Sequence, residues 1–522
     1  MGTTALASSS RGAVSRKRKN CFLAGWILIM ARACLGGQVG QAAPQQVPRY
    51  RVEYATYFGG SEWEQPREIV SLSDGSAVIG GQTASSDLPV TEGAAQRKYG
   101  GEPAGTGHGG VYGGDCFIAK LNPTASKIVF CTYWGGSKQE RATYGFDVDS
   151  AGNIVVCTAC RSHDAPTTKD SYQPTYGGGR SDVLLGKLAA DGRKFLWCTY
   201  IGGRGEDWPR GGTALDSHGN IIVVGRNTSA NFPGTEGVIR PKLQGQNGDA
   251  MIVKISGDGR KLIWATLLGG SDWDGLMGAR VDKAGNVYVA GHTRSRDLPV
   301  SEGAAQPTAG GESDVFLACI TPDAKRIRYC TYLAGSRNEW AEHRPALLED
   351  GSFLLTGVTA SSDFPTTQRA CQRKLKGKND GFLVKLAPDG KRLAFCTLLG
   401  GSGGDFFLMP TVGPRGNIYM VGGTSSKDFP VTRDALQPTF GGGQGDAVLA
   451  VLSGDGSKLL YATYIGGSGG DLIRGLAVTK RGEIYLAGNT NSDDLPFISR
   501  SAAQPKRKGG HDGIIIKLAP VR

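Results

Sequence analysis

The chain has 522 residues, 81 of them glycine, and a formal net charge of +12 at pH 7. No basic stripe interleaved with aromatic residues stands out, which disfavours a nucleic-acid-binding protein. The glycines fall in turns between short alternating segments, and no apolar run of useful length has the helical period. The composition therefore favours an all-β protein with many tight turns.

The N-terminal segment has the layout of a secretory signal peptide. A basic run at residues 16–19 precedes an apolar run at residues 21–31, and Gly40 and Ala42 supply small residues at the −3 and −1 positions of a cleavage site. The apolar run is short for a membrane span, and Arg32 interrupts it.

We therefore expect a signal peptide at residues 1–42 and a linker at residues 43–49, with an uncleaved signal anchor as the alternative. The signal implies an extracytoplasmic protein that is secreted, periplasmic or on the cell surface, without a transmembrane span once the signal is removed. Six basic and no acidic residues lie in this segment, so the mature chain would carry a net charge of +6.

Residues 51–60 (RVEYATYFGG) form an alternating apolar stretch that ends in a Gly-Gly turn, and this stretch recurs along the chain. Its threonine marks the repeat, with successive spacings of 76, 67, 67, 65, 66 and 66 residues. The threonines are Thr56, Thr132, Thr199, Thr266, Thr331, Thr397 and Thr463. A fixed period of this size indicates an array or a closed ring of units.

Each unit contains four expected strands. After Thr463 the sequence predicts an inner strand at 475–479, a second strand at 483–488, a long connection, and a third strand that begins at Asp512. In earlier units an Asp-Gly hairpin then leads into the next Gly-Gly stretch. Four-stranded units around a ring are β-propeller blades, and seven second strands predict seven blades.

The ring is expected to close through its first strand. The chain begins with an isolated fourth strand at 51–58 and ends after the third strand of its last unit. Pairing these two strands removes an exposed edge. We therefore predict a single seven-bladed β-propeller of four-stranded antiparallel blades over residues 50–522, and we expect a monomer.

The repeated motifs resemble those of the bacterial SBBP β-propeller repeat family. They are the Gly-Gly turn, the second strand GNVYVAG at 285–291, the connection Asp-Leu-Pro at 297–299, and an aspartate before the third strand, and they recur over about residues 50–520. The resemblance implies a seven-bladed propeller in a secreted or cell-surface protein. It implies no particular reaction.

One aspartate precedes the third strand of every unit. A catalytic residue would be needed only once, so sevenfold repetition favours a turn-capping role through backbone amides. These residues are Asp115, Asp182, Asp249, Asp314, Asp380, Asp446 and Asp512.

A second acidic position lies four residues after the last glycine of each Gly-Gly turn. These candidates for ligand binding are Glu64, Glu140, Asp207, Asp274, Glu339, Asp405 and Asp471. We expect them on the loop that crosses the top face towards the channel mouth. There they either hold the loop by hydrogen bonds or bind a polar ligand or a cation such as calcium, which favours several carboxylate oxygens.

Four tryptophans lie beside this position, and they are the remaining candidates for ligand binding: Trp63, Trp208, Trp273 and Trp340. Burial between blades competes with an exposed platform for sugar rings or peptide side chains. The long connections emerge on the same face, whereas the Asp-Gly turns of the other face are short. The top face is therefore the expected binding face.

The repeat is broken in two places. A glycine-rich insertion at 101–114 indicates a mobile flap or a tolerated insertion. In the fifth unit Glu342, His343 and Arg344 cluster, and we favour a surface ion cluster over general acid–base chemistry. Arg344, and Glu68 in the first unit, replace the glycine near the axis and would polarise the channel.

The cysteines outside the signal number nine, and no disulfide framework is evident. Four of them share a repeat slot with alanine, which indicates a small buried residue. Only Cys319 and Cys330 look placed for a bridge. Cys157 and Cys160 with His163 resemble part of a zinc site, but no second ligand pair follows, so we assign no metal.

We expect a binding scaffold for a protein or a glycan that acts through its top face without catalysis. The alternatives are a polysaccharide-active hydrolase or lyase that uses top-face carboxylates, and a purely structural surface module. We assign no catalytic residue and no cofactor other than the calcium weighed above.

Overall fold

The computed structural model divides the chain into two compact units, residues 1–46 and 47–522. The structure describes residues 49–103 and 114–521. The predicted signal peptide, all but the end of the predicted linker, and most of the insertion at 101–114 lie outside the described residues. No helix among the described residues is long and apolar enough to cross a membrane.

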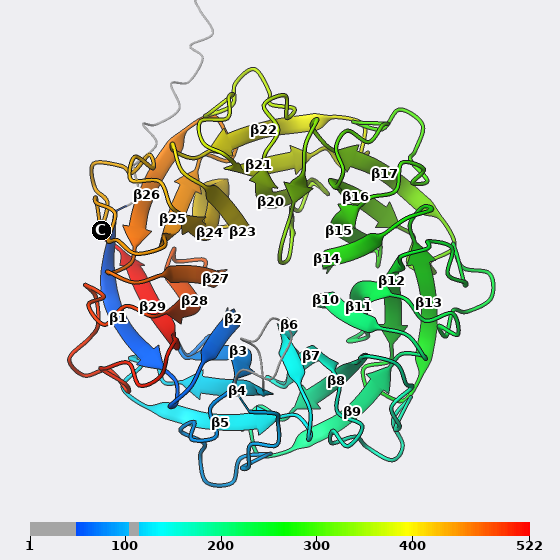
Figure 1. Ribbon diagram of the computed structural model, residues 1–522, viewed down its shortest axis with the longest axis horizontal. Helices are drawn as coiled ribbons and strands as arrows, with labels where there is room; N and C mark the ends of the chain where they lie inside the picture. The colour runs from blue at the N-terminus through cyan, green and yellow to red at the C-terminus, as the bar shows by residue number, and fades with distance from the viewer. Residues whose placement is uncertain (1–48, 104–113, 522) are drawn as a thin grey trace, which may run out of the picture. The chain divides into compact units, whose positions relative to one another are not determined.

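Seven antiparallel sheets are arranged in a ring in residues 50–520, as the repeat predicts (Figure 1). We call the region that the inner strands face the channel. From the inner to the outer strand, blade one holds β2 (Glu64–Ser71), β3 (Ala77–Thr83), β4 (Asp115–Leu121) and β5 (Ile128–Trp134); blade two holds β6 (Glu140–Val148), β7 (Ile154–Cys160), β8 (Asp182–Leu188) and β9 (Phe195–Ile201); blade three holds β10 (Asp207–Leu215), β11 (Ile221–Asn227), β12 (Asp249–Ile255) and β13 (Leu262–Leu268); and blade four holds β14 (Asp274–Val281), β15 (Val287–Thr293), β16 (Asp314–Ile320) and β17 (Ile327–Leu333).

The remaining three blades follow the same plan, with two exceptions. Blade five has its inner strand in two pieces, and blade seven takes its outer strand from the start of the propeller. Blade five holds β18 (Glu339–Trp340), β19 (Ala346–Leu347), β20 (Phe353–Thr359), β21 (Asp380–Leu386) and β22 (Leu393–Leu399); blade six holds β23 (Asp405–Val412), the short helical turn η2 (Pro414–Gly416), β24 (Ile418–Thr424), β25 (Asp446–Leu452) and β26 (Leu459–Ile465); and blade seven holds β27 (Asp471–Val478), β28 (Ile484–Thr490), β29 (Asp512–Pro520) and β1 (Tyr50–Phe58).

Strand β1 closes the ring, as predicted. It pairs antiparallel with β29, from Tyr50 opposite Pro520 to Phe58 opposite Gly513. The backbone N–H of Gln504 also donates a hydrogen bond of 3.1 Å to Oγ1 of Thr56, which repeats the bond that the connection makes to the outer strand in other blades. Blade seven is therefore assembled from both ends of the propeller.

The apolar core lies between the blades. Each of seven clusters draws its residues from two neighbouring blades, because successive residues of a strand point to opposite faces. In β12, for example, Ile252 packs towards blade four and Met251 packs towards blade two. The short alternating strands of the sequence thus supply both faces of every sheet.

The described cysteines are free thiols, and eight of the nine are buried. Cys319 and Cys330, the one pair that looked placed for a bridge, do not form it. Ala318 is the residue opposite Cys330, so the two thiols point to opposite faces of blade four and into different clusters. The same rule separates Cys157 from Cys160, which lie three residues apart on β7 and pack towards different blades.

Candidate functional site

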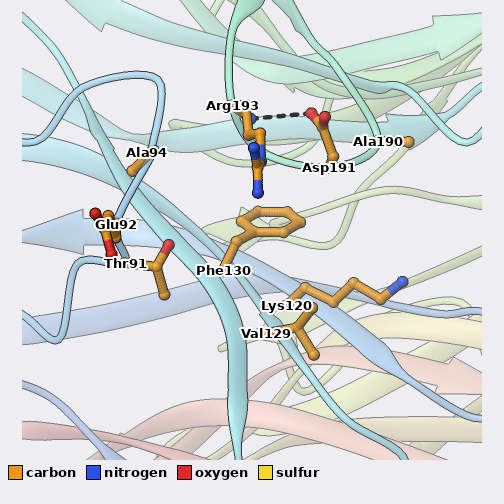
Figure 2. A pocket seen from close by; sticks show the side chains of 10 residues that line it. Thr91, Glu92, Ala94, Lys120, Val129, Phe130, Ala190, Asp191 and Arg193 are labelled. Carbon is orange, nitrogen blue, oxygen red and sulfur yellow. Dashed lines mark hydrogen bonds between the residues drawn. The ribbon is translucent and has the colours of Figure 1, made fainter.

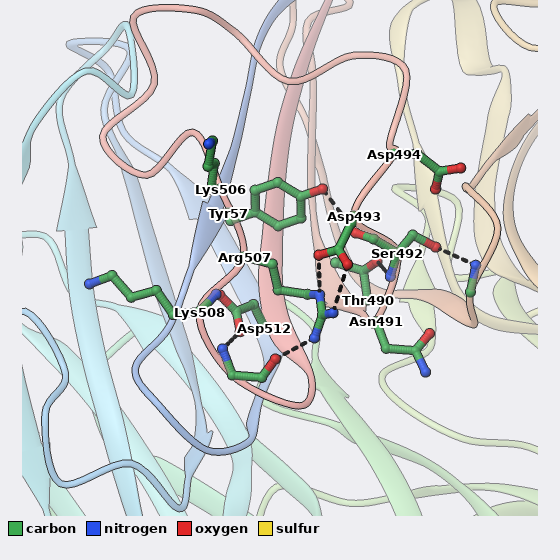
Figure 3. A network of polar contacts seen from close by, with 12 residues as sticks. Tyr57, Thr490, Asn491, Ser492, Asp493, Asp494, Lys506, Arg507, Lys508 and Asp512 are labelled. Carbon is green, nitrogen blue, oxygen red and sulfur yellow. Dashed lines mark hydrogen bonds and ion pairs between the residues drawn. The ribbon is translucent and has the colours of Figure 1, made fainter.

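The aspartate before each third strand caps the preceding turn, as predicted. Figure 3 shows this in blade seven, where the N–H groups of Lys508 and Gly509 each donate a hydrogen bond of 2.8 Å to Asp512. In the same connection Arg507 forms an ion pair with Asp493 at 3.0 Å. The other six aspartates accept backbone N–H groups in the same way. These carboxylates position the long connections of the top face.

The second acidic position forms a buried carboxylate ring. Each member is the first residue of an inner strand and accepts the N–H of the second glycine of the preceding turn, over 2.7–2.9 Å. The side chains are fully buried in six blades and 8% exposed at Asp471. The predicted loop-holding role is therefore confirmed. The carboxylates are enclosed in the blades and are not exposed at the channel mouth.

Members of the carboxylate ring and the turn-capping aspartates are close neighbours. A Cβ on Gly59 would lie 2.3 Å from Oε2 of Glu64 and 3.0 Å from Cγ of Asp512, which explains the first glycine of the turn. Burial, and to a lesser extent Asp512, raises the pKa of Glu64 to about 7. Burial, and to a lesser extent the neighbouring carboxylate of Glu140, raises the pKa of Asp115 to about 8.

The arrangement bears on the predicted calcium site without testing it. Thr83 donates a hydrogen bond of 2.7 Å to the second oxygen of Glu64, so both oxygens of this carboxylate have protein partners. Among the residues that the structure describes, no group of three or more histidine, cysteine, aspartate or glutamate side chains is placed to hold a metal ion. Calcium binding at the carboxylate ring stays a prediction.

The four tryptophans differ in burial. Trp63 is buried, whereas Trp208, Trp273 and Trp340 are half-buried. Trp208 and Trp340 are each the second residue of an inner strand, immediately after a member of the carboxylate ring. Their position is therefore at the top mouth of the channel.

An arginine guanidinium lies against each of the three half-buried indole rings. The guanidinium of Arg141 lies 4.4 Å from the ring centre of Trp208, and that of Arg210 lies 4.8 Å from the ring centre of Trp340. Arg226 similarly lies 5.5 Å from the ring centre of Trp273. These distances are typical of cation–π contacts, so the mouth combines flat aromatic faces with positive charge.

Residues 341–345 of blade five leave the sheet and form a plug in the channel. Between β18 and β19 the inner strand is interrupted, and Figure 1 shows the loop beside β20 reaching into the centre of the ring. Pro345 has no N–H for a strand ladder, and His343 adopts a φ of 72°. The plug is therefore encoded where blade five departs from the repeat.

The plug is anchored at both ends on blade four. The N–H of Ala341 donates to Nε2 of His292 over 3.2 Å, and the His292 ring packs edge-on to Trp340 at 3.8 Å. At the other end a Cβ on Gly278 would lie only 2.4 Å from Cδ of Pro345. Only glycine at position 278 allows this close approach.

Glu342 of the plug meets three arginines, which we call the arginine cluster. They are Arg67, Arg210 and Arg474, at distances of 2.9, 3.6 and 3.7 Å from the Glu342 carboxylate. Burial alone would raise the pKa of Glu342, but the three guanidinium groups hold it well below its usual range. Glu342 is therefore ionised and is a poor general base.

Arg344 and His343 occupy the next level of the channel. Nη1 of Arg344 lies 2.8 Å from Asp147, and Nη2 lies 3.6 Å from Glu68. Burial lowers the pKa of His343, which favours its neutral form. Glu68, His343 and Arg344 are each less than 7% exposed, so the predicted surface ion cluster is wrong. The cluster polarises the channel from within, as expected for Glu68 and Arg344.

The arginine cluster was missed by the sequence analysis, although a signal was present. Each of its members is the fourth residue of an inner strand, in β2, β10 and β27. The sequence places arginine seven residues after the last glycine of three turns and Glu342 at the same offset in a fourth. Comparing the departures between units would have found this set.

Several cavities lie away from the plug among the described residues, including one at the rim, one at the far end of the inner strands and one on the top face. A rim pocket of about 310 Å³ is shown in Figure 2, where the ring of Phe130 lies below the guanidinium of Arg193. A cavity of about 920 Å³, which Arg280 and Leu347 help to line, opens at the far end of the inner strands. A third, of about 410 Å³, lies on the top face between blades six and seven beside Phe406 and Leu472.

Two turns have the Gly-x-Ser-x-Gly form that surrounds the nucleophile of many hydrolases, at residues 400–404 and 466–470. The hydroxyl of Ser402 donates a hydrogen bond of 2.9 Å to Asp428, and Ser61, outside any such pattern, bonds Asp87 in the same way. These serines are therefore structural residues of the repeated turn.

Comparison with solved structures finds matches at low identity, one of which is described as a β-propeller domain. The chain is similar to BamB from Moraxella catarrhalis (TM-score 0.38, 11% identity, 90% of this chain and 99% of that chain). It is also similar to the WD40 β-propeller domain of Doa1 (0.44, 10%, 90% and 97%) and to the polysaccharide lyase Uly1 (0.42, 9%, 91% and 99%). We base no functional argument on these scores.

Comparison with protein families gives a more specific result. The family described as SBBP: Beta-propeller repeat matches residues 460–496, from strand β26 to the connection after β28. No curated protein matches the chain. The matched motif recurs in every one of the seven blades. The chain is therefore a seven-bladed β-propeller in which residues 460–496 match the SBBP β-propeller repeat.

Proposed function

We propose that this protein is an extracytoplasmic binding scaffold that takes a glycan or protein ligand at the top mouth of its channel, without catalysis. The observation that carries the proposal is the set of half-buried indole rings of Trp208, Trp273 and Trp340, each paired with an arginine. A flat aromatic face beside a charge suits a sugar ring or a peptide side chain. The signal-like residues 1–42 support an extracytoplasmic location.

The test begins with a glycan array and a pull-down to identify a ligand, followed by affinity measurements on single variants. We expect Trp208→Ala and Trp340→Ala to weaken binding at least tenfold, and a melting curve of each variant shows that it is folded at the temperature of the assay. Leu196→Ala, at an exposed apolar residue of the outer strand of blade two, is the matched control. If no ligand binds saturably, the protein is a purely structural module.

A polysaccharide-active hydrolase or lyase is the second candidate. Burial raises the pKa of ring carboxyl groups such as Glu140 to about 7, which suits a general acid near neutral pH, but catalysis also requires that the substrate reach a carboxyl group enclosed in the blade. A panel of polysaccharide substrates tests it. Turnover that is lost in Glu339→Gln and retained in Leu196→Ala would replace the binding proposal with an enzymatic one.

A further inference from the structure

The arginine cluster contains more positive charge than its internal partner neutralises. Arg67, Arg210 and Arg474 converge on the single carboxylate of Glu342. The other acids near the cluster are Asp147 and Glu68, which pair with Arg344, and Glu68 also attracts Arg67. Three guanidinium groups share one carboxylate, and Arg210 is the most exposed of the three, so the positive charge around Arg210 favours a further anion there.

Arg210 has hydrogen-bond donors to offer a ligand. Arg67 donates a hydrogen bond to Glu342, whereas Arg210 approaches only to ion-pair distance. Among the described residues no hydrogen bond acceptor is seen for the Arg210 guanidinium, and its side chain is 25% exposed. A guanidinium offers five N–H donors in a planar fork that matches carboxylate and sulfate oxygens.

The rings of Trp208 and Trp340 flank the same guanidinium. They lie 5.7 and 4.8 Å from the Cζ atom of Arg210. A ligand that reaches Arg210 through the top mouth therefore meets two aromatic faces as well as the charge. A sugar ring that carries an acidic group matches both, because its flat C–H face packs on an indole while its anionic group binds the fork.

We infer that the arginine cluster is the binding site for the acidic groups of an anionic glycan, with Glu342 as a built-in competitor. This inference rests on the proposed function, since it specifies the ligand of the same top mouth. In the free protein the Glu342 carboxylate binds the guanidinium groups that would bind the ligand's carboxylate or sulfate. The Glu342 side chain is 18% exposed and the plug that carries it is fixed at both ends, so Glu342 stays beside the cluster and competes with the ligand for the shared guanidinium groups.

The experiment measures binding of the full chain to four polymers: polygalacturonate for carboxylate, dextran sulfate for sulfate, dextran as the neutral sugar, and poly-L-glutamate as an acidic peptide. We expect one or both acidic glycans to bind, dextran and polyglutamate to bind at least tenfold more weakly, and binding to weaken as salt is raised. The preferred acidic glycan identifies the acidic group.

Variants assign the binding to the cluster. Arg210→Gln should weaken binding at least tenfold, Arg210→Lys should keep part of it, and Glu342→Gln should strengthen it severalfold by removing the competitor. Arg260→Gln is the control, since Arg260 is 60% exposed on an Asp-Gly turn of the other face. A melting curve of each variant shows that it is folded, and Arg210 is the most exposed member of the cluster.

Several results would overturn the inference. It fails if neither acidic glycan binds, if dextran or polyglutamate binds as tightly, or if Arg210→Gln binds like the unaltered protein. Should a neutral glycan or a protein bind with dependence on Trp208, the inference fails while the proposed function stands. If Arg210→Gln loses affinity and Trp208→Ala does not, the arginine cluster binds the acidic group but the tryptophan rings do not contact the ligand. That result would contradict the aromatic part of the inference.

Discussion

At the scale of single residues, Gly278 tests the packing of the plug. An added methyl group would lie 2.4 Å from Cδ of Pro345 and 2.9 Å from the carbonyl oxygen of His343. We expect Gly278→Ala to lower the free energy of unfolding by about 1–3 kcal/mol, because the plug must shift to relieve the clash. Denaturant unfolding measures the loss.

Gly510→Ala is the matched control for this prediction. Its nearest neighbour would be the carbonyl oxygen of Glu62 at 4.0 Å, so an ordinary contact replaces a clash. If both variants unfold at the same denaturant concentration as the parent, the plug accommodates the methyl group and is not tightly held.

Residues whose role repeats could be predicted from the sequence, and residues that act once could not. Asp512 was assigned as a turn cap because it has six equivalents, and its hydrogen bonds confirm the role. Arg210 has weaker support, because arginine fills its position in only three blades, and its recognition requires comparing where the units depart from the repeat. Trp63 is buried and Trp208 is half-buried, although both lie beside the same repeat position. The difference depends on the neighbouring blade, which the local sequence does not reveal.

At the scale of elements, strand β1 is expected to contribute strongly to stability. Deleting residues 50–58 removes every partner of the outer edge of β29 and takes away the buried side chains of Tyr54, Tyr57 and Phe58. We expect the loss to be several kcal/mol, from apolar area and from the cavity left behind. Thermal unfolding of the truncated protein measures it.

Two controls accompany this deletion. Arg51→Ala, on the same strand with a side chain that is 69% exposed, should leave the melting temperature nearly unchanged. A synthetic peptide of residues 50–58 should restore part of the lost stability by pairing with β29. An unchanged melting temperature after deletion would mean that the ring closes in another way.

The path of the plug, residues 341–345, could not be predicted from the sequence. The acid, histidine and arginine of the fifth unit were recognised as a departure, but they were placed on the surface. Whether such a segment stays in the inner strand or leaves it depends on what faces it across the channel. Here Gly278 leaves space and the arginine cluster supplies charge, and both come from other blades.

At the scale of the whole molecule, the paired carboxyl groups make stability depend on pH. Burial raises the pKa of Asp115 to about 8 and those of Glu64, Glu140 and Asp182 to about 7, against about 4 in an unfolded chain. The folded state thus holds protons that the unfolded state has released. The contribution of these groups to stability is therefore greatest below about pH 4 and is lost as pH rises from about 4 to about 8, where the last of them ionises in the folded state.

We therefore expect the melting temperature to fall as pH is raised from 6.5 to 8 at constant ionic strength. Below pH 6.5 buried histidines oppose the trend, because burial lowers the pKa of His292 to about 3. Asp182→Asn should make the dependence shallower, since an amide imitates the protonated acid. Asp170→Asn, at a side chain that is 72% exposed, should not. A melting temperature that rises over this range would contradict the assignment.

The pairing of β1 with β29 also constrains the order in which the molecule can form. During synthesis β1 emerges before the other strands, yet its partner spans Asp512–Pro520, so this contact joins residues more than 450 positions apart. Contacts of such separation form late, because the entropy of closing the loop must be met first. A chain that lacks β29 would leave both β1 and β28 with an open edge. Shortening the C-terminal end should therefore promote aggregation more than shortening the N-terminal end.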